Sequence, residues 1–288
     1  MSFVALATCR NIPEPDLDEP LLLAALERAR VPAKVLAWDD EAVDWNEPRL
    51  TVIRSTWNYY LRPDAFRAWV TERGARLVNA PEIIHWNHHK RYLADLAARG
   101  VPVVPTLWIP KEGSPGDQLT CTGWTDIVVK PAVSAGSYRT RRLTGPPFDE
   151  AVLAASFALA DTMVQPYIAS VDAYGERSLI YIDGAITHAI RKSPRFAGQS
   201  EQVWGEAVAI ADDEREAASR TLACVTGSPL YARIDLVRDA EGRPLLGELE
   251  LIEPSLFLVH NPAAADRFAA AIARRFDEAG AGPATFGR

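Results

Sequence analysis

The chain has 288 residues, of which 48% are hydrophobic and 24% charged, and its formal net charge is −7. This length is too great for one ordinary core and favours two or three packed lobes. The negative charge argues against a general nucleic-acid-binding protein. No apolar run approaches a membrane span, the first residues lack a signal peptide's basic leader, and three distant cysteines do not indicate a disulfide scaffold. We therefore expect a cytoplasmic protein.

The first eighty residues alternate between short apolar runs and amphipathic segments. The expected strands are 3–8, 35–38, 50–54 and 77–79, and the expected helices are 19–30 and 63–72. Alternation of this kind is typical of a doubly wound parallel sheet. We therefore predict an α/β lobe over residues 1–80.

Ligands of doubly wound sheets bind at the loops that follow the carboxyl ends of the strands. Two such loops carry polar and aromatic residues, namely Arg10 with Asn11, and Arg54 with Ser55 and Trp57. We interpret these residues as facing the substrate, with either arginine suited to hold a carboxylate. Alternatively, the polar side chains only cap and solvate their loops, and for Trp57 packing and ligand contact are equally favoured.

A second unit includes expected helices at 88–99 and 148–159 and strands at 126–130, 138–143 and 162–165. The small residues Ser134, Gly136 and Ser137 join two of these strands, and such a turn can cup a phosphate with backbone N–H groups. Lys130 ends the strand just before the turn, where its ammonium could reach the same phosphate. An ordinary turn and a solvated lysine are the competing interpretations.

The last third is expected to contain strands at 177–182 and 186–192, helices at 212–226 and 262–279, and a hairpin that carries three acids. Asp235 ends one strand of the hairpin, and Glu248 and Glu250 project to one face of the returning strand, since residues two apart share a face. Three neighbouring carboxylates repel one another unless a cation lies between them. The pattern therefore predicts a Mg²⁺ site and a nucleotide-dependent enzyme.

The order of these features resembles the ATP-grasp superfamily, which includes glutathione synthetase and D-alanine–D-alanine ligase. The segments that carry the resemblance are Asn87–Leu93, Val101–Thr106, Ile127–Pro131, Ser134–Ser137, Gln165–Ile168, Gly175–Leu179 and Arg233–Asp235 with Glu248–Glu250. The resemblance implies an N-terminal substrate lobe (1–80) and two α+β subdomains (81–168 and 169–288) that clasp ATP, the second with the metal site.

The resemblance also implies roles for residues that contact the nucleotide. Lys90 and Lys130 look like the two lysines that contact its phosphates and adenine. Gln165 and Tyr167 look like the segment between subdomains that binds adenine, where Pro166 ends the strand pairing and leaves backbone groups free. Glu176 lies near positions that meet the ribose or the metal.

Asp235 and Glu248 look like the paired metal carboxylates of the superfamily, which would hold two Mg²⁺ ions. Members of the superfamily usually have Glu-x-Asn on the last strand, whereas this chain has Glu248-x-Glu250. The departure keeps an oxygen ligand and adds a charge. Whether Glu250 or Glu253 is the third ligand is left open by the sequence.

An ATP-grasp enzyme transfers the γ-phosphoryl group to a carboxylate, and an amine then attacks the acyl phosphate. Positioning and neutralisation of charge supply most of the acceleration in phosphoryl transfer. Arg233 and Lys192 are placed to hold the acyl phosphate, although Arg233 could equally pair with the neighbouring acids. A small-molecule phosphotransferase and a non-catalytic ATP-binding regulatory module are the alternatives.

The segment Ser193–Glu206 is polar and contains glycines, and we expect it to close over ATP and exclude water. Three segments of the first lobe, Arg10–Pro20, Trp38–Trp45 and Arg54–Tyr59, resemble a bacterial ATP-grasp subgroup that includes the D-cycloserine synthetase type. That subgroup implies a small amino-acid-like substrate, with O-ureido-D-serine closing a ring through its own nitrogen. A homodimer is an expectation from the superfamily.

Overall fold

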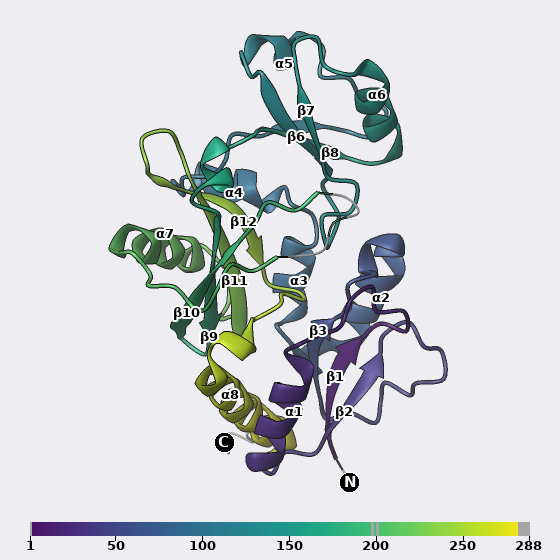
Figure 1. Ribbon diagram of the computed structural model, residues 1–288. Coiled ribbons are helices and arrows are strands. Elements are labelled where there is room, and N and C mark those ends of the chain that lie inside the picture. Colours follow the sequence, from purple (N-terminus) through teal and green to yellow (C-terminus); the bar gives the residue numbers. More distant parts are fainter. Residues whose placement is uncertain (1, 197–198, 200–201, 282–288) are drawn as a thin grey trace, which may run out of the picture.

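The protein is described by a computed structural model that covers residues 2–196, 199 and 202–281. Three four-stranded sheets follow one another along the molecule, and Figure 1 shows them at the bottom, centre and top of the view. Short 3₁₀ turns lie at Tyr59–Leu61, Gly74–Arg76, Ala169–Asp172 and Leu258–His260. Cys9, Cys121 and Cys224 are unpaired. In the part of the chain that the structure describes, no helix combines the length and apolar character needed to cross a membrane.

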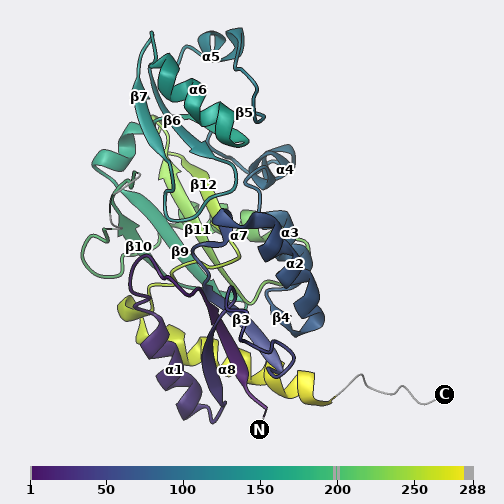
Figure 2. The same ribbon diagram turned by 90° about the vertical axis from the view of Figure 1, so that its right-hand side faces the viewer.

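The N-terminal sheet is parallel, with the order β2-β1-β3-β4. Its strands are β1 (Val4–Thr8), β2 (Ala33–Ala37), β3 (Leu50–Ser55) and β4 (Leu77–Val78). Alternate residues of β1 face opposite sides, so Val4 and Leu6 join one core and Ala5 and Ala7 another. Helices α1 (Glu19–Arg28) and α8 (Pro262–Ala281) cover the first side, and α2 (Pro63–Arg73) and α3 (Pro81–Asn87) the second (Figure 2). The predicted doubly wound lobe is confirmed.

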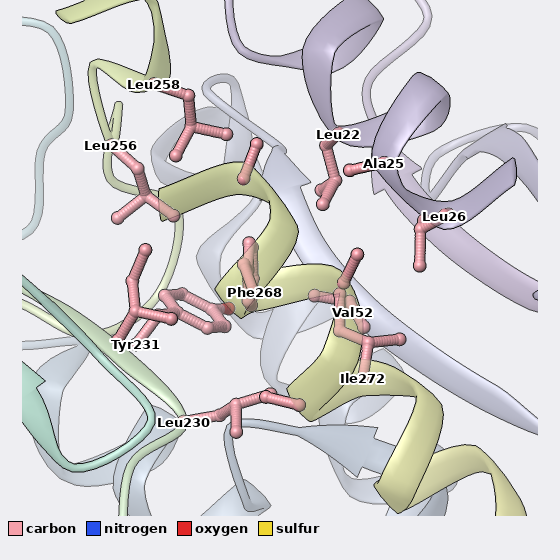
Figure 3. Close-up of a cluster of buried hydrophobic side chains, with 14 of the residues drawn as sticks. Leu22, Ala25, Leu26, Val52, Leu230, Tyr231, Leu256, Leu258, Phe268 and Ile272 are labelled. Carbon is pink, nitrogen blue, oxygen red and sulfur yellow. The ribbon is translucent and has the colours of Figure 1, made fainter. Parts of the chain in front are cut away.

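The last helix of the chain packs on the first lobe. Phe268 and Ile272 of α8 meet Leu22 and Leu26 of α1, and Tyr231 closes the cluster (Figure 3). The Tyr231 hydroxyl also lies within hydrogen-bond distance of three backbone oxygens, those of Ile53, Val78 and Ile252, and can donate to one of them at a time. The first and last parts of the chain therefore share one core, and the predicted boundary at residue 80 stays a prediction.

The sheet formed by the middle part of the chain, called the central sheet for its place in the sequence, lies at the top of Figure 1. It is antiparallel, in the order β5-β8-β6-β7. It consists of β5 (Leu107–Ile109), β6 (Asp126–Pro131), β7 (Arg141–Thr144) and β8 (Thr162–Pro166), with helices α5 (Asp117–Cys121) and α6 (Glu150–Leu159). Asp149 caps α6 by accepting from the backbone N–H groups of Ala151 and Val152. Lys130 of β6 and Gln165 of β8 lie on neighbouring antiparallel strands, with Lys130 opposite Met163 and Gln165 opposite Val128.

The C-terminal sheet forms the polar floor of the functional cavity. Its strands are β9 (Glu176–Ile182), β10 (Ala185–Lys192), β11 (Tyr231–Arg238) and β12 (Pro244–Glu250), in the antiparallel order β10-β9-β11-β12. Ile234 and Leu249 face a core completed by α4 (Tyr92–Ala98) and α7 (Asp212–Ala223). The intervening residues are charged and face the other side, so the sequence alternation produces one apolar and one acidic face.

Local backbone geometry explains where the predicted elements differ from the observed ones. The helix predicted at 88–99 begins only at Tyr92, and the missed helix α3 begins at Pro81, a residue suited to the first helical position. The strand predicted at 138–143 lies at Arg141–Thr144, because Ser137 and Arg139 have positive φ angles that extend the turn. Helix α5 was also missed.

Candidate active site

A cavity of about 290 Å³ lies where the three sheets meet. Its floor is the charged face of β11 and β12, and its walls come from the N-terminal lobe, the central sheet and the segment after β10. Ligand pockets of this kind commonly measure about 300–1,000 Å³. Most of the residues expected to contact the nucleotide or metal line this cavity, namely Lys90, Lys130, Ser134, Gly136, Ser137, Gln165, Tyr167, Glu176, Lys192, Arg233, Asp235, Glu248 and Glu250.

The hairpin brings its acids together by cross-strand pairing. Asp235 of β11 lies opposite Glu248 of β12, and Arg233 lies opposite Glu250. Directly opposed residues in a sheet have side chains close enough to interact. The predicted convergence of Asp235, Glu248 and Glu250 on one sheet face therefore agrees with the observed register.

Asp235 is buried, and basic side chains hold it ionised. Its carboxylate accepts from Arg233 Nε and Nη2 at 3.0–3.1 Å and from Lys192 Nζ at 3.2 Å, and the Ser178 hydroxyl also donates to it. Burial raises the pKa of Asp235, but the neighbouring Arg233 and Lys192 outweigh burial and hold this pKa well below its usual range.

Glu248 has a separate set of basic partners. Lys90 Nζ lies 2.8 Å from one carboxylate oxygen, and Lys130 Nζ lies 3.8 Å from the other. Lys90 Nζ also donates to the backbone oxygen of Ser134 at 2.8 Å. Burial opposes ionisation of Glu248, but both lysines lower its pKa below the usual value. The two lysines are therefore grouped around one carboxylate beside the small-residue turn.

Glu176 and Glu250 are the less strongly ionised acids of the floor. Glu250 contacts Arg233, yet burial raises the pKa of Glu250 to about 7 against the effect of that arginine. Lys192 Nζ lies 2.7 Å from Glu176, whose pKa is also raised by burial. Lys192 thus links Glu176 to Asp235.

The acids fit a magnesium site in their donor chemistry. Among the described residues, no three acidic, histidine or cysteine side chains form a group arranged to hold a metal ion by themselves. Mg²⁺ is usually held by one or two carboxylates together with substrate phosphates and water, so a complete protein cage is not needed. Asp235 and Glu248 supply the carboxylate oxygens, and their basic neighbours are of the kind that contacts phosphate.

The small-residue turn is shaped as a backbone cradle. Gly136 and Ser137 have φ angles of +56° and +58°, and both line the cavity next to Lys130. Successive N–H groups in such a turn form a concavity that can bind an anion. At Gly136, any other residue would be strained in this left-handed conformation.

Gln165 and Tyr167 also line the cavity. The Gln165 side chain donates from Nε2 to Thr106 Oγ1 at 2.9 Å. The backbone N–H of Tyr167 donates to the backbone oxygen of Asp126 at 2.8 Å, so pairing continues one residue beyond Pro166, where the sequence had led us to expect it to end. Burial and a hydrogen bond to Asp172 raise the pKa of Tyr167 to about 12.

The residues expected to face the substrate separate into two groups. Trp57 lines the cavity, and its Nε1 donates to the backbone oxygen of Glu253 at 3.0 Å. Arg10 and Asn11 are exposed and outside the cavity lining. Ser55 is buried and donates to Thr8 Oγ1.

Arg54 is buried away from the cavity, so the structure places it in the protein interior rather than against the substrate. Its Nη2 donates to the Pro254 backbone oxygen at 3.0 Å and lies 3.5 Å from Asp18. Asp18 in turn accepts from the backbone N–H groups of Leu256 and Leu258. The pair therefore fixes the backbone that follows Glu253.

The segment after β10 covers one side of the cavity. Arg195 forms an ion pair with Glu14 of the N-terminal lobe at 3.1 Å, and Phe196 contacts the Tyr167 ring with centroids 6.4 Å apart. All of these residues line the cavity. Residues 197–198 and 200–201 of the segment Ser193–Glu206 lie outside the described residues.

Several cavity residues were not predicted from the sequence, among them Glu14, Tyr59, Tyr60 and Ser255. Glu14 belongs to the first loop, in which Arg10 and Asn11 were the residues predicted to face the substrate. Tyr59 and Tyr60 follow Trp57 in a loop already identified as facing a ligand. An aromatic run at a strand end was the signal that could have identified them.

The arrangement of the three sheets is the ATP-grasp fold. The crystal structure of D-alanine–D-alanine ligase from Bacillus anthracis shares this fold, with 14% identity, a TM-score of 0.70 and coverage of 97% of each chain. Residues 4–79 match the family described as D-cycloserine synthetase DcsG, N-terminal domain.

Full-length relatives are more specific. The cycloserine biosynthesis protein DcsG of Streptomyces lavendulae is 34% identical over 300 residues, covering 96% of this chain and 99% of the relative. The crystal structure of D-cycloserine synthetase DcsG is 32% identical, with a TM-score of 0.86 and coverage of 96% of this chain and all of its own. The chain belongs to the DcsG family of ATP-grasp enzymes. It is an ATP-dependent carboxylate–amine ligase.

Proposed function

We propose that this enzyme is a cyclo-ligase that phosphorylates the carboxylate of an amino-acid-like substrate and closes a ring through a nitrogen of the same molecule. The full-length similarity to a D-cycloserine synthetase carries this proposal, because it includes the N-terminal lobe. That lobe supplies Glu14 and Trp57 to the cavity wall. O-ureido-D-serine is the substrate to test first.

Lys90 and Lys130 bind the phosphates of ATP in this proposal, together with the backbone of the Ser134–Ser137 turn. Their shared contact with Glu248 supports the assignment, since it holds both ammonium groups at the floor beside the turn. Gln165 and Tyr167 contact the adenine of ATP in this proposal. The side chain of Gln165 is oriented by Thr106, which limits its motion.

Asp235, Glu248 and Glu250 are the proposed ligands of a pair of Mg²⁺ ions, with Glu176 at the edge of the site. The metal, when bound, neutralises charge on the transferred phosphoryl group. Asp235 is the most firmly ionised of these acids, because the positive charges of Arg233 and Lys192 lower its pKa. Glu250 requires the loss of a proton near neutral pH before it can serve as a ligand.

Arg233 and Lys192 are the proposed catalytic cations that hold the acyl phosphate. Both are buried at the floor and line the cavity. A donor that is already oriented stabilises developing negative charge without reorganisation. The ATP γ-phosphoryl group is transferred to the substrate carboxylate, and the nitrogen then attacks the acyl carbon, losing a proton as phosphate leaves.

An acyl phosphate must be protected from water until the nitrogen attacks. The segment Ser193–Phe196 is placed to do this, since it touches both the adenine wall and the N-terminal lobe. The segment proposed to close over ATP therefore also contacts the N-terminal lobe, where the substrate is expected to bind.

The test is a panel assay of ADP release with Mg²⁺ and ATP. O-ureido-D-serine, its L isomer and the D and L protein amino acids are supplied singly, and then with an added amine. We expect ADP and a cyclic product from O-ureido-D-serine alone. A stable phosphate ester would instead identify a phosphotransferase, and a need for added amine would identify an intermolecular ligase. The homodimer and the cytoplasmic location stay predictions.

A further inference from the structure

One acid in the cavity differs from the others in its partners. Six acidic side chains from the described part of the chain line the cavity, namely Glu14, Glu176, Asp235, Glu248, Glu250 and Glu253. Five of these acids form ion pairs. The pairs are Glu14 with Arg195, Glu176 with Lys192, Asp235 with Arg233, Glu248 with Lys90, and Glu250 with Arg233. Within the described residues, Glu253 makes neither an ion pair nor a side-chain hydrogen bond. The floor therefore holds one carboxyl group that these residues leave without an ion-pair partner.

Glu253 is buried as well as unpaired, with only 7% of its surface exposed. A buried carboxylate without a cation or hydrogen-bond donor is unfavourable, so such a group either keeps its proton or receives a charged partner. Burial and the nearby Glu250 raise the pKa of Glu253 well above its usual value. The carboxyl is therefore suited to bind an incoming cation that replaces its proton.

The backbone around Glu253 is fixed from the N-terminal lobe. Trp57 Nε1 donates to the backbone oxygen of Glu253 at 3.0 Å, and Arg54 Nη2 donates to the backbone oxygen of Pro254 at 3.0 Å. From the floor of the cavity, Arg233 Nη1 donates to the backbone oxygen of Ser255, with 3.5 Å between the two atoms. The backbone at Glu253 is thus held between the N-terminal lobe and the floor of the cavity.

Glu253 lines the cavity together with Tyr59, Lys90 and Arg233. Burial, and after it the charge of Glu253, raise the pKa of Tyr59. Lys90 and, to a smaller degree, Arg233 lower the pKa of Glu253. Glu253 therefore shares the cavity with two cations of the floor.

We propose that Glu253 is a specificity-determining residue that binds the ammonium group of the amino-acid substrate. The inference rests on the proposed function and adds to it the group by which an amino acid is distinguished from a simple carboxylic acid. An amino acid carries its ammonium and carboxylate groups on one carbon, and the same cavity is lined by the acid Glu253 and by the cation Arg233. Glu250 is less suited, because Arg233 already occupies it.

The test compares O-ureido-D-serine with its analogue that lacks the amine, 3-(ureidooxy)propanoic acid, in the wild-type enzyme and in Glu253→Gln. We expect the wild type to prefer the amine by about 100-fold or more in kcat/KM, since a site with a polar group left unpaired rejects such analogues. In Glu253→Gln that preference should fall at least tenfold, mainly through KM for the amino acid. The KM for ATP and the Mg²⁺ dependence should stay unchanged, and Glu253→Asp should recover part of the preference.

A matched control is Glu216→Gln, an exposed acid of α7 that pairs with Arg220 outside the cavity. It should keep the wild-type preference. The inference is overturned if the wild type turns over both compounds equally, if Glu253→Gln keeps the full preference, or if its defect is corrected by more Mg²⁺, which would make Glu253 a metal ligand. Failure of the proposed function has a different signature, namely a wild-type enzyme that forms no cyclic product from O-ureido-D-serine.

Discussion

Asp235 and Glu248 lie directly opposite each other on β11 and β12, yet each carboxylate is surrounded by its own set of basic side chains. Arg233 and Lys192 contact Asp235, whereas Lys90 and Lys130 approach Glu248. Two carboxylates in this arrangement remain ionised side by side only because four cations compensate them. The pair therefore offers oxygen ligands to a metal and phosphate-binding cations to a nucleotide at one place.

Asp235→Asn and Glu248→Gln should each lower kcat/KM by about 100-fold or more, since each removes the charge of a proposed metal ligand. The measurement is ADP release at saturating ATP across a range of Mg²⁺ concentrations. Glu241→Gln changes an exposed acid in the turn of the same hairpin and should leave the rate unchanged. Full activity in both floor variants would contradict the metal assignment.

Arg54→Met tests the structural role of the buried arginine. We expect a loss of about 3–5 kcal/mol in the free energy of unfolding, because Asp18 would remain buried without its cation. Urea unfolding at neutral pH measures this loss, and the double variant Asp18→Asn with Arg54→Met should lose less. Wild-type stability combined with a raised KM for the amino acid would instead restore the substrate role expected from the sequence.

Arg195→Gln and Glu14→Gln test the contact between the segment after β10 and the N-terminal lobe. A partly exposed ion pair contributes about 1 kcal/mol or less, so stability should hardly change. We expect ADP release to exceed product formation, because water reaches the acyl phosphate in a loosened site. The exchanged pair Glu14→Arg with Arg195→Glu should recover the coupling. Equal amounts of ADP and product in both single variants would rule out this role.

His88 should make the protein less stable in acid. Burial, with a smaller effect from Arg67, lowers the pKa of His88 to about 4, and the ring packs against Tyr59 and Phe66. Because the unfolded chain takes up this proton near pH 6.5, stability falls as the pH drops from about 6.5 towards 4. The cost is about 2 kcal/mol at pH 5.

His88→Phe keeps an aromatic ring and removes the titration. Its unfolding free energy should therefore fall less between pH 7 and pH 5 than that of the wild type. Urea unfolding at the two pH values measures the difference. An identical pH dependence in the two proteins would show that His88 is not responsible.

The site floor could be predicted from the sequence because it depends on a local rule. Alternation of apolar and charged residues in β11 and β12 places Arg233, Asp235, Glu248 and Glu250 on one face, and the short hairpin sets their register. Strand ends likewise identified Lys130 and Gln165. The parallel N-terminal lobe followed from the alternation of strands and helices.

Contacts between distant segments could not be predicted in this way. Arg54 follows a buried strand and has the pattern of a ligand-facing residue, but its hydrogen-bond partner Pro254 is 200 positions away. Glu14 meets Arg195 across 181 positions. Only the packed structure shows that Arg54 is enclosed by protein and that Arg195 borders the cavity.

The central claim is that the substrate carboxylate is activated as an acyl phosphate. The most direct test supplies substrate labelled with ¹⁸O in its carboxylate and follows the released phosphate by mass spectrometry. If the carboxylate is activated as an acyl phosphate, one ¹⁸O atom appears in each phosphate formed together with the product. Unlabelled phosphate, released while product accumulates, would contradict it.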